Sequence, residues 1–118
     1  MADRNYVIKD GVQATDHVLM TIAGIAACEV EGVASLNGGL THENVSRISR
    51  NRISHAVRIM QNDDGSLTAQ VIIVVKYGYT IVDVSMQVQD KVKASLENMT
   101  DLTVRDVDVK IMDVAVQE

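Results

Sequence analysis

A run of five β-branched residues, Val-Ile-Ile-Val-Val at positions 71–75, is the strongest structural constraint in this sequence. β-branched side chains favour strands over helices because their χ1 freedom is restricted, and a run this short suits a strand. Both pleat faces of the run are apolar, whereas a half-exposed strand alternates apolar with polar residues. We therefore expect this strand to lie centrally in its sheet, either with both faces covered or with one face left for a partner.

Two stretches have the three- and four-residue spacing of helices with one buried face. The first covers residues 16–31, with Thr15 or Asp16 as N-cap and Gly32 just after its end. Its expected buried residues are Val18, Leu19, Ile22, Ala23, Ile25, Ala26 and Val30. The second covers residues 80–100, with the Thr80 hydroxyl as N-cap. Its expected buried residues are Ile81, Val84, Val88, Val92, Leu96 and Met99.

Shorter apolar stretches predict further strands. Residues 6–8 read as a first strand that follows a loose N-terminus at residues 1–5. A second strand, which begins near His55, is joined to the central strand by a hairpin turn at residues 62–65. Between the first helix and this strand, residues 41–54 are polar, with room for one short amphipathic helix whose inward side chains would be Val45, Ile48 and Ile53.

The last strand covers residues 107–111, and bulges near Asp106 and Asp113 would bring its flanking valines into phase. The element order is then β-α-β-β-α-β, and a strand-helix-strand crossover usually joins parallel strands. These rules predict an α+β fold, a two-layer sandwich in which two helices cover one face of a mixed sheet of about four strands. We expect the whole chain, residues 1–118, to form a single domain.

The sheet face away from the helices is a candidate interaction surface. In the predicted arrangement it carries Ile72 and Val74 from the central strand and Arg58 and Met60 from the neighbouring strand. Contiguous exposed apolar surface marks protein contact sites. The four residues therefore predict a face for self-association or for a protein partner.

Arg47, Arg50, Arg52 and Arg58 are the only concentration of positive charge in the sequence. Guanidinium groups at this density could contact phosphates or an acidic protein surface. The alternative is a solvated surface that balances an acidic chain. The net charge of −5 at pH 7 favours this alternative, since the long-range field repels phosphates. A nucleic-acid-binding module is thus an alternative function that the charge disfavours.

No pattern in the sequence is typical of catalysis, of a metal site or of a cofactor site. Glu29 and Glu31 point about 200° apart on a helix, so they cannot share a substrate. The three histidines are too widely spaced for metal ligation. Cys28 has no adjacent basic residue to lower its pKa and fits a reducing compartment. Without a signal peptide or an apolar run of membrane-spanning length, we expect a cytoplasmic protein with neither enzyme activity nor cofactor.

Five stretches of the sequence follow one another in an order and at a spacing that point to a known family. They are residues 22–27 (IAGIAA), 29–33 (EVEGV), 74–78 (VVKYG), 88–92 (VQDKV) and 100–109 (TDLTVRDVDV). Together they resemble the alkaline shock (envelope stress response) family of Gram-positive bacteria over nearly the whole chain. The chain departs from the family pattern at Val82, where a proline is usual, and at Asp101, where a glycine is usual.

The resemblance implies a small cytoplasmic protein without known catalysis that self-associates and acts near the cell envelope. Some members are held at the membrane by a separate anchor protein, and others are linked to control of acetyl-CoA carboxylase, which begins fatty-acid synthesis. The family has no established active site to carry over. We therefore expect an envelope stress-response homo-oligomer with a protein partner, either a membrane-anchor protein or, as the alternative function, this biosynthetic enzyme.

Overall fold

One long strand, β5 (Leu67–Lys76), organises the computed structural model, which describes residues 5–116. Along one edge it pairs in parallel with β6 (Val104–Ala115) over its whole length. Along the other edge it pairs antiparallel with β4 (Val57–Gln61) over its first half and with β3 (Val33–Leu36) over its second half. The β-branched run is therefore central in a mixed four-stranded sheet, as its composition predicts.

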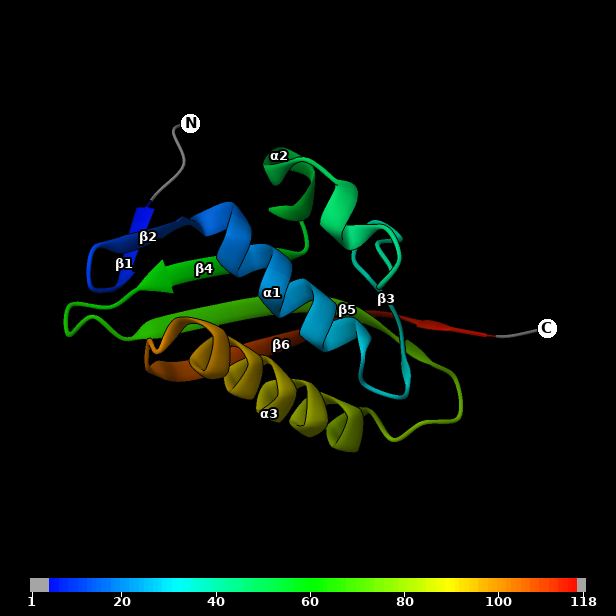
Figure 1. Cartoon of the computed structure of the whole chain (residues 1–118). Coiled ribbons are helices and arrows are strands. Elements are labelled where there is room, and N and C mark those ends of the chain that lie inside the picture. The colour runs from blue at the N-terminus through cyan, green and yellow to red at the C-terminus, as the bar shows by residue number, and fades with distance from the viewer. Residues whose placement is uncertain (1–4, 117–118) are drawn as a thin grey trace.

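Two long helices, α1 (Asp16–Cys28) and α3 (Ile81–Thr100), lie side by side on one face of this sheet (Figure 1). Alternate residues of β5, from Leu67 to Val75, point toward the helices and are buried. The crossover from β5 through α3 to β6 joins parallel strands, as predicted. The predicted α+β two-layer sandwich, with two helices on one face of a mixed sheet, is confirmed.

The core between helices and sheet is aliphatic. The sequence has neither Phe nor Trp, so β-branched residues, leucine and alanine fill the layer. Burying one such Val, Leu or Ile side chain contributes about 1.5–3 kcal/mol of hydrophobic stabilisation. The fully buried residues that the two helices supply are Leu19, Ala23, Ala27, Val88, Val92 and Leu96.

The N-terminal strand does not join the main sheet, which corrects the predicted role of residues 6–8. β1 (Asn5–Lys9) and β2 (Val12–Thr15) form a separate antiparallel hairpin. Asp10 and Gly11 both have positive φ, 53° and 83°, the requirement of a two-residue type I′ turn. This local pairing takes up β1, and β3 occupies the edge of the main sheet instead. Of the predicted loose segment, residues 1–5, all but Asn5 lie outside the described residues.

The helix boundaries differ from the predicted ones mainly at α1. The Thr15 hydroxyl accepts a hydrogen bond from the Val18 amide (3.3 Å), so Thr15 is the N-cap. The helix ends at Cys28, three residues before the predicted end. Thr80 occupies the N-cap position of α3, but its hydroxyl accepts no capping bond, contrary to prediction. Asp101 follows α3 in the left-handed conformation, with φ 60°.

The polar segment 41–54 holds two short helical turns, η1 (Val45–Arg47) and α2 (Arg50–Ile53), rather than one helix. Val45 and Ile53 are fully buried, and Ile48 packs partly against the core, as the amphipathic pattern predicts. His55 lies in the turn before β4 and is exposed, so its predicted place in a strand is wrong.

The predicted hairpin turn and β6 bulges are confirmed, whereas Ile81, predicted to be buried, is 43% exposed. Residues 62–65 turn the chain between β4 and β5. The register of β6 shifts between Val104 and Asp106 and again between Ile111 and Asp113, where bulges are predicted. Because of these shifts, Val104, Val107 and Ile111 all face the helices despite their irregular spacing.

Candidate functional site

The face of the four-stranded sheet opposite α1 and α3 carries the four residues predicted for a partner surface. Arg58 pairs with Gln70, and residues two apart in a strand share a face, so Arg58, Met60, Ile72 and Val74 lie on one side. Met60 is 49% exposed and Arg58 is exposed, whereas Ile72 and Val74 are half-buried. We call this surface the open sheet face; its residues are Ser35, Arg58, Met60, Gln70, Ile72, Val74, Asp108, Lys110 and Asp113.

The open sheet face has an apolar centre and charged flanks. On its β6 side, Asp108 lies opposite Gln70, Lys110 opposite Ile72 and Asp113 opposite Val74. All three charged residues are exposed. An apolar centre inside a polar rim is the usual anatomy of a protein–protein interface.

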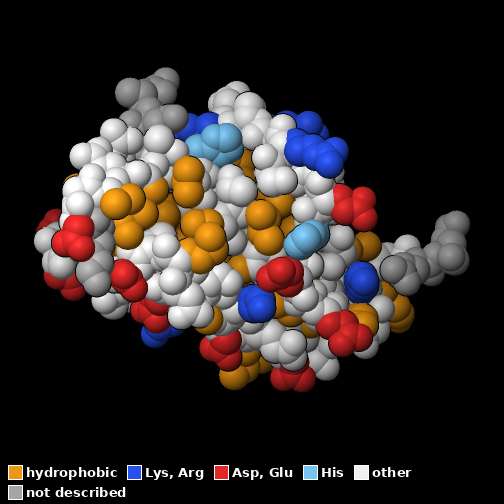
Figure 2. Space-filling model, in the orientation of Figure 1, with side chains coloured by type: hydrophobic (Ala, Val, Ile, Leu, Met, Phe, Trp, Pro, Cys, Tyr) orange, Lys and Arg blue, Asp and Glu red, His pale blue; other side chains and the backbone are white. Residues whose placement is uncertain are grey.

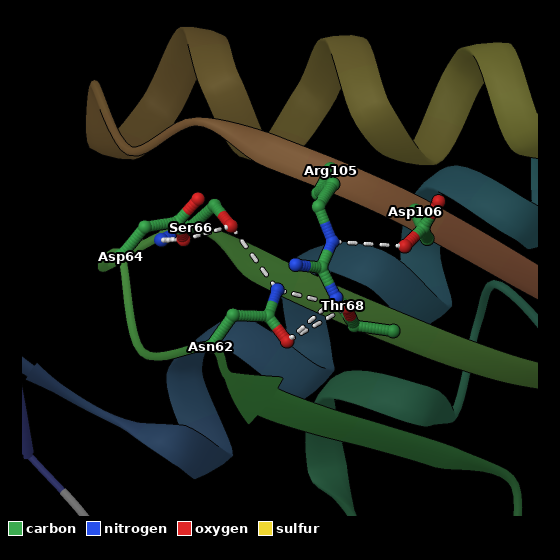
Figure 3. Close-up of polar contacts among 6 residues, drawn as sticks. All are labelled: Asn62, Asp64, Ser66, Thr68, Arg105 and Asp106. Carbon is green, nitrogen blue, oxygen red and sulfur yellow. Dashed lines mark hydrogen bonds and ion pairs between the residues drawn. The ribbon is translucent and has the colours of Figure 1, made fainter.

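A polar cluster closes one end of the open sheet face, beside the β4–β5 turn (Figure 3). Asn62 Nδ2 donates to Ser66 Oγ (3.1 Å) and to Thr68 Oγ1 (3.0 Å). Arg105 Nη2 donates to Asn62 Oδ1 (3.2 Å), and Arg105 Nε donates to Asp106 Oδ2 (3.1 Å). Ser66 and Thr68 are buried polar residues, and these bonds satisfy them. The cluster therefore stabilises the β4–β5 turn.

The same turn lowers one pKa. Ser66 Oγ donates to Asp64 Oδ1 (2.6 Å), and the Ser66 amide donates to the same oxygen (2.9 Å). Hydrogen bonds to the ionised form favour it, so the Ser66 side chain holds the pKa of Asp64 below its usual value. The carboxylate remains charged at neutral pH and fixes the turn.

The four arginines of the predicted basic patch do not share one role. Arg50 Nε lies 3.0 Å from Asp16 Oδ1, and Arg50 Nη2 lies 2.6 Å from Asp16 Oδ2. This bidentate ion pair ties α2 to the first turn of α1. Arg47 and Arg52 are exposed on η1 and α2, whereas Arg58 lies on the open sheet face.

A second apolar surface, missed by the sequence prediction, lies on the helix side of the molecule. An open groove of about 500 Å³ runs between α1 and α3, and Figure 2 shows hydrophobic side chains over and beside α1 on this side. Val18, predicted to be buried, is 46% exposed, and Ile22 and Ile25 are only partly buried. Met99, also predicted to be buried, is 66% exposed. The apolar stripe of α1 is thus wider than the area that the sheet and α3 cover. We call this surface the helix groove; its apolar residues are Val18, Ile22, Ile25, Ala26 and Met99.

Cys28 is not in an environment that activates a thiol. Burial, together with the neighbouring Glu29 carboxylate, raises the pKa of Cys28 to about 11. The thiol lies 3.9 Å from the Leu40 carbonyl oxygen, to which it can donate a weak hydrogen bond. At neutral pH almost no thiolate is present, and the thiolate is the nucleophilic form.

Glu29 and Glu31 have separate partners, but not for the predicted reason, because α1 ends at Cys28 and both residues lie beyond the helix. Glu29 lies 3.7 Å from Lys91 Nζ and 3.7 Å from His42 Nε2. Glu31 accepts a hydrogen bond from the Tyr79 hydroxyl (3.2 Å), which raises the pKa of that hydroxyl. The two carboxylates therefore do not form an acid–base pair.

Among residues 5–116, no three His, Cys, Asp or Glu side chains gather closely enough to hold a metal ion. No helix among these residues has both the length and the apolar character needed to cross a membrane.

The outer edge of β6 is partly protected. No other described strand pairs with this edge, which leaves backbone groups without ladder partners. Gln89 of α3 donates its side-chain amide to the Val107 carbonyl (3.1 Å). Charged residues and two bulges along β6 disfavour edge-to-edge pairing. The sheet is therefore better suited to contacts through its open face than through this edge.

Comparison with known proteins shows the family to which the chain belongs. A family model described as "ASP23 family, cell envelope-related function" matches residues 6–116. The chain belongs to the ASP23 family. The family resemblance inferred from the five sequence stretches is thereby confirmed, and the family is related to the cell envelope.

Relatives cover most of the chain. The uncharacterized protein YqhY of Bacillus subtilis (strain 168) is 35% identical over 101 residues, which span 86% of this chain and 74% of YqhY. The uncharacterized protein Spy1535 of Streptococcus pyogenes serotype M6 is 31% identical over 94 residues, which span 80% of this chain and 70% of that protein. These relatives support the family membership without adding an activity.

Solved structures of the MamM CTD have a similar fold. A triple variant of that domain superposes with a TM-score of 0.50 at 16% identity and covers 87% of this chain and 96% of that chain. A single-substitution variant gives 0.51 at 14% identity and covers 83% of this chain and 96% of that chain. At this level of identity the likeness concerns the fold alone.

Proposed function

We propose that this protein is a non-catalytic envelope stress-response protein that acts by self-association through the open sheet face and by binding a protein partner near the membrane. One observation carries the proposal: Ile72 and Val74, at the centre of the sheet, are partly exposed on the face that neither long helix covers. Burying such a surface against another protein removes apolar area from water, which is the main driving force for association.

The chemistry of the remaining surface supports an interaction role. Cys28, the one thiol in the sequence, has a raised pKa, and the paired glutamates have separate partners. Arg50, the arginine at the centre of the basic segment, is held by Asp16. What the open sheet face offers instead is a mixed apolar and charged surface, which suits contacts between proteins.

The experiment for self-association is light scattering after size exclusion over a concentration series. Wild type is expected to gain molar mass with concentration, and the double variant Ile72→Asp, Val74→Asp to stay monomeric because it places charges at the centre of the open sheet face. Met60→Asp, at a position of the same face that is 49% exposed, serves as a second variant. Val18→Asp, in the helix groove, is the matched control and should associate like wild type.

Circular dichroism shows whether each variant is folded. A wild type that is monomeric throughout, or a folded Met60→Asp variant that associates as wild type does, would overturn the proposed role of the open sheet face. If Val18→Asp alone abolished association, the helix groove would be the working surface instead.

Recruitment to the membrane is proposed to occur through a protein rather than through lipid. The net charge of −5 repels anionic headgroups. The chain should therefore not bind vesicles of phosphatidylglycerol and phosphatidylethanolamine, but should bind native membrane vesicles of its source cells. Protease treatment of the native vesicles should abolish that binding. Binding to the protein-free vesicles, or binding that survives protease, would contradict a protein anchor.

A further inference from the structure

A row of three residues crosses the open sheet face and has opposite charges at its ends. Arg58 of β4 pairs with Gln70 of β5, and Gln70 pairs with Asp108 of β6. Strands lie about 4.8 Å apart, so Arg58 and Asp108 are about 10 Å apart across the row. Both side chains are exposed, and neither forms an ion pair with any residue in the described part of the chain.

Arg58 and Asp108 share the face with two further exposed charges of β6, Lys110 opposite Ile72 and Asp113 opposite Val74. Asp106, the next acidic residue of β6, is already bound by Arg105. β3 and β4 contain no acidic residue, so Arg58 has no carboxylate on its own side of β5. The apolar centre, Ile72 and Val74, follows Gln70 along β5. The β4 flank is therefore positive at Arg58 and the β6 flank is negative at Asp108, with Gln70 between the two, and the centre of the face is apolar.

We propose that two copies of this chain pack by their open sheet faces about a two-fold axis parallel to β5. The inference rests on the self-association proposed above and adds its geometry. A two-fold rotation about the strand direction turns one sheet over onto the other and exchanges its left and right flanks. Arg58 of each copy then lies over Asp108 of the other, which gives two identical ion pairs. Ile72 and Val74 meet their own counterparts along the axis, at the spacing of about 10 Å that is usual for packed sheets.

The charge pattern selects this axis over one perpendicular to the strands. A two-fold axis perpendicular to the strands would keep the β3–β4 flank over the same flank of the second copy. Arg58 would then face strands without an acidic residue, and Asp108 would face the β6 of the other copy. Of these two axes, the one parallel to β5 brings opposite charges together on both flanks. Aligned packing of sheets tolerates a crossing angle of about 30°, which moves residues this close to the axis by only a few ångströms.

The geometry predicts an unusual result when two charge-reversed variants are mixed. Arg58→Asp alone places two acidic residues opposite each other at both contacts, and Asp108→Arg alone places two arginines there. Each variant should therefore associate at least about tenfold more weakly than wild type. In a mixed dimer, one contact pairs the introduced aspartate of one copy with the introduced arginine of the other. The second contact of that dimer keeps the natural pair of Arg58 and Asp108.

The experiment is sedimentation velocity on each variant alone, on their equimolar mixture and on the double variant. The mixture and the double variant should both recover association to within about threefold of wild type. Recovery in the mixture is decisive because a contact within one copy could be restored only in the double variant. Lys93→Asp and Asp90→Arg, with the same charge changes on the exposed side of α3, are the matched controls and should associate like wild type.

The outcomes separate this inference from the function on which it rests. If wild type associates and Met60→Asp weakens association, but the mixture does not recover, the two-fold axis is wrong and the open sheet face remains the working surface. If wild type is monomeric, both are overturned. In 1 M salt the difference between the variants and wild type should shrink, since the Debye length falls to about 3 Å.

Discussion

Arg50 and Asp16 are joined by two hydrogen bonds, of 3.0 and 2.6 Å, although 34 residues separate them in the sequence. The Asp16 side chain is only 7% exposed. The pair connects the segment between β3 and β4 to the start of α1, so that Val45 and Ile53 are held over the core. An arginine that the sequence offers as a binding residue is thus a structural one.

Removing that guanidinium should destabilise the fold. Arg50→Ala is expected to lower the free energy of unfolding by about 2–3 kcal/mol, because it leaves a buried carboxylate without its bidentate donor. Arg52→Ala, which removes an exposed arginine from the same helical turn, is the control and should change it by less than about 0.5 kcal/mol. Urea unfolding measures both. Equal effects of the two substitutions would show that the ion pair contributes little.

Gly32 is required by its backbone and by its surroundings. It has φ +100°, and a Cβ there would lie 2.7 Å from Val84 Cγ2 and 2.9 Å from Tyr79 Cδ2. Gly32→Ala should therefore cost about 2–4 kcal/mol in unfolding free energy, from backbone strain and overpacking together. Gly38→Ala has a similar φ, +83°, in open space, so it should cost only the strain, about 1–2 kcal/mol. If the two substitutions lowered the free energy of unfolding equally, the close contact with Val84 would contribute nothing to the effect of Gly32→Ala.

Asp101 holds a left-handed position after α3, where the resemblance leads one to expect glycine. Asp101→Gly should raise the free energy of unfolding by about 0.5–1 kcal/mol, because glycine adopts φ 60° without a Cβ penalty. Asp101→Asn tests the contribution of charge, since it removes a carboxylate from the negative end of the helix dipole but keeps a Cβ. Its free energy of unfolding should rise by less than that of the glycine variant. A larger rise with asparagine would show that the charge of Asp101, and not its Cβ, is the destabilising feature.

Local sequence patterns are sufficient to predict most of the strands, helices and turns. The β-branched run, the turn at residues 62–65 and the bulges near Asp106 and Asp113 depend on neighbours in sequence, and all are found. The choice of edge strand is different. Residues 6–8 and 33–36 are both short and apolar, so either could form the edge strand beside β5. The hairpin turn at Asp10-Gly11 pairs β1 with β2, which leaves residues 33–36 to pair with β5.

The surfaces were harder to predict than the elements. Periodicity identifies the apolar residues of α1 but does not tell how much of the stripe its neighbours cover, so it predicts a buried Val18 where the structure has an exposed one. The partner of Arg50 is distant in sequence and leaves no local signal. The grouping of Ile72 and Val74 with Arg58, in contrast, follows from strand alternation and the hairpin register alone. Asp108 joins them only through the parallel pairing of β6.

The raised pKa of Cys28 predicts slow alkylation with a shifted pH profile. With a pKa near 11 against an ordinary value of 9.0, the thiolate fraction at pH 8 falls about 100-fold. In the folded protein the rate of reaction with iodoacetamide should rise about tenfold per pH unit up to pH 10, without a plateau. In urea, where the thiol has its ordinary pKa, the rate should be half-maximal near pH 9 and level off above it. A plateau below pH 9 in the folded protein, with the fold verified by circular dichroism, would contradict the assigned environment.

Association through the open sheet face is tested most directly by methyl NMR of the wild-type protein over a dilution series. The methyl signals of Ile72, Val74 and Met60 are expected to shift or broaden as concentration rises. Those of Val18 and Ile22 in the helix groove should stay constant, because that surface remains in solvent. Concentration-dependent signals confined to the helix groove, with Ile72 and Val74 unchanged, would contradict the role of the open sheet face.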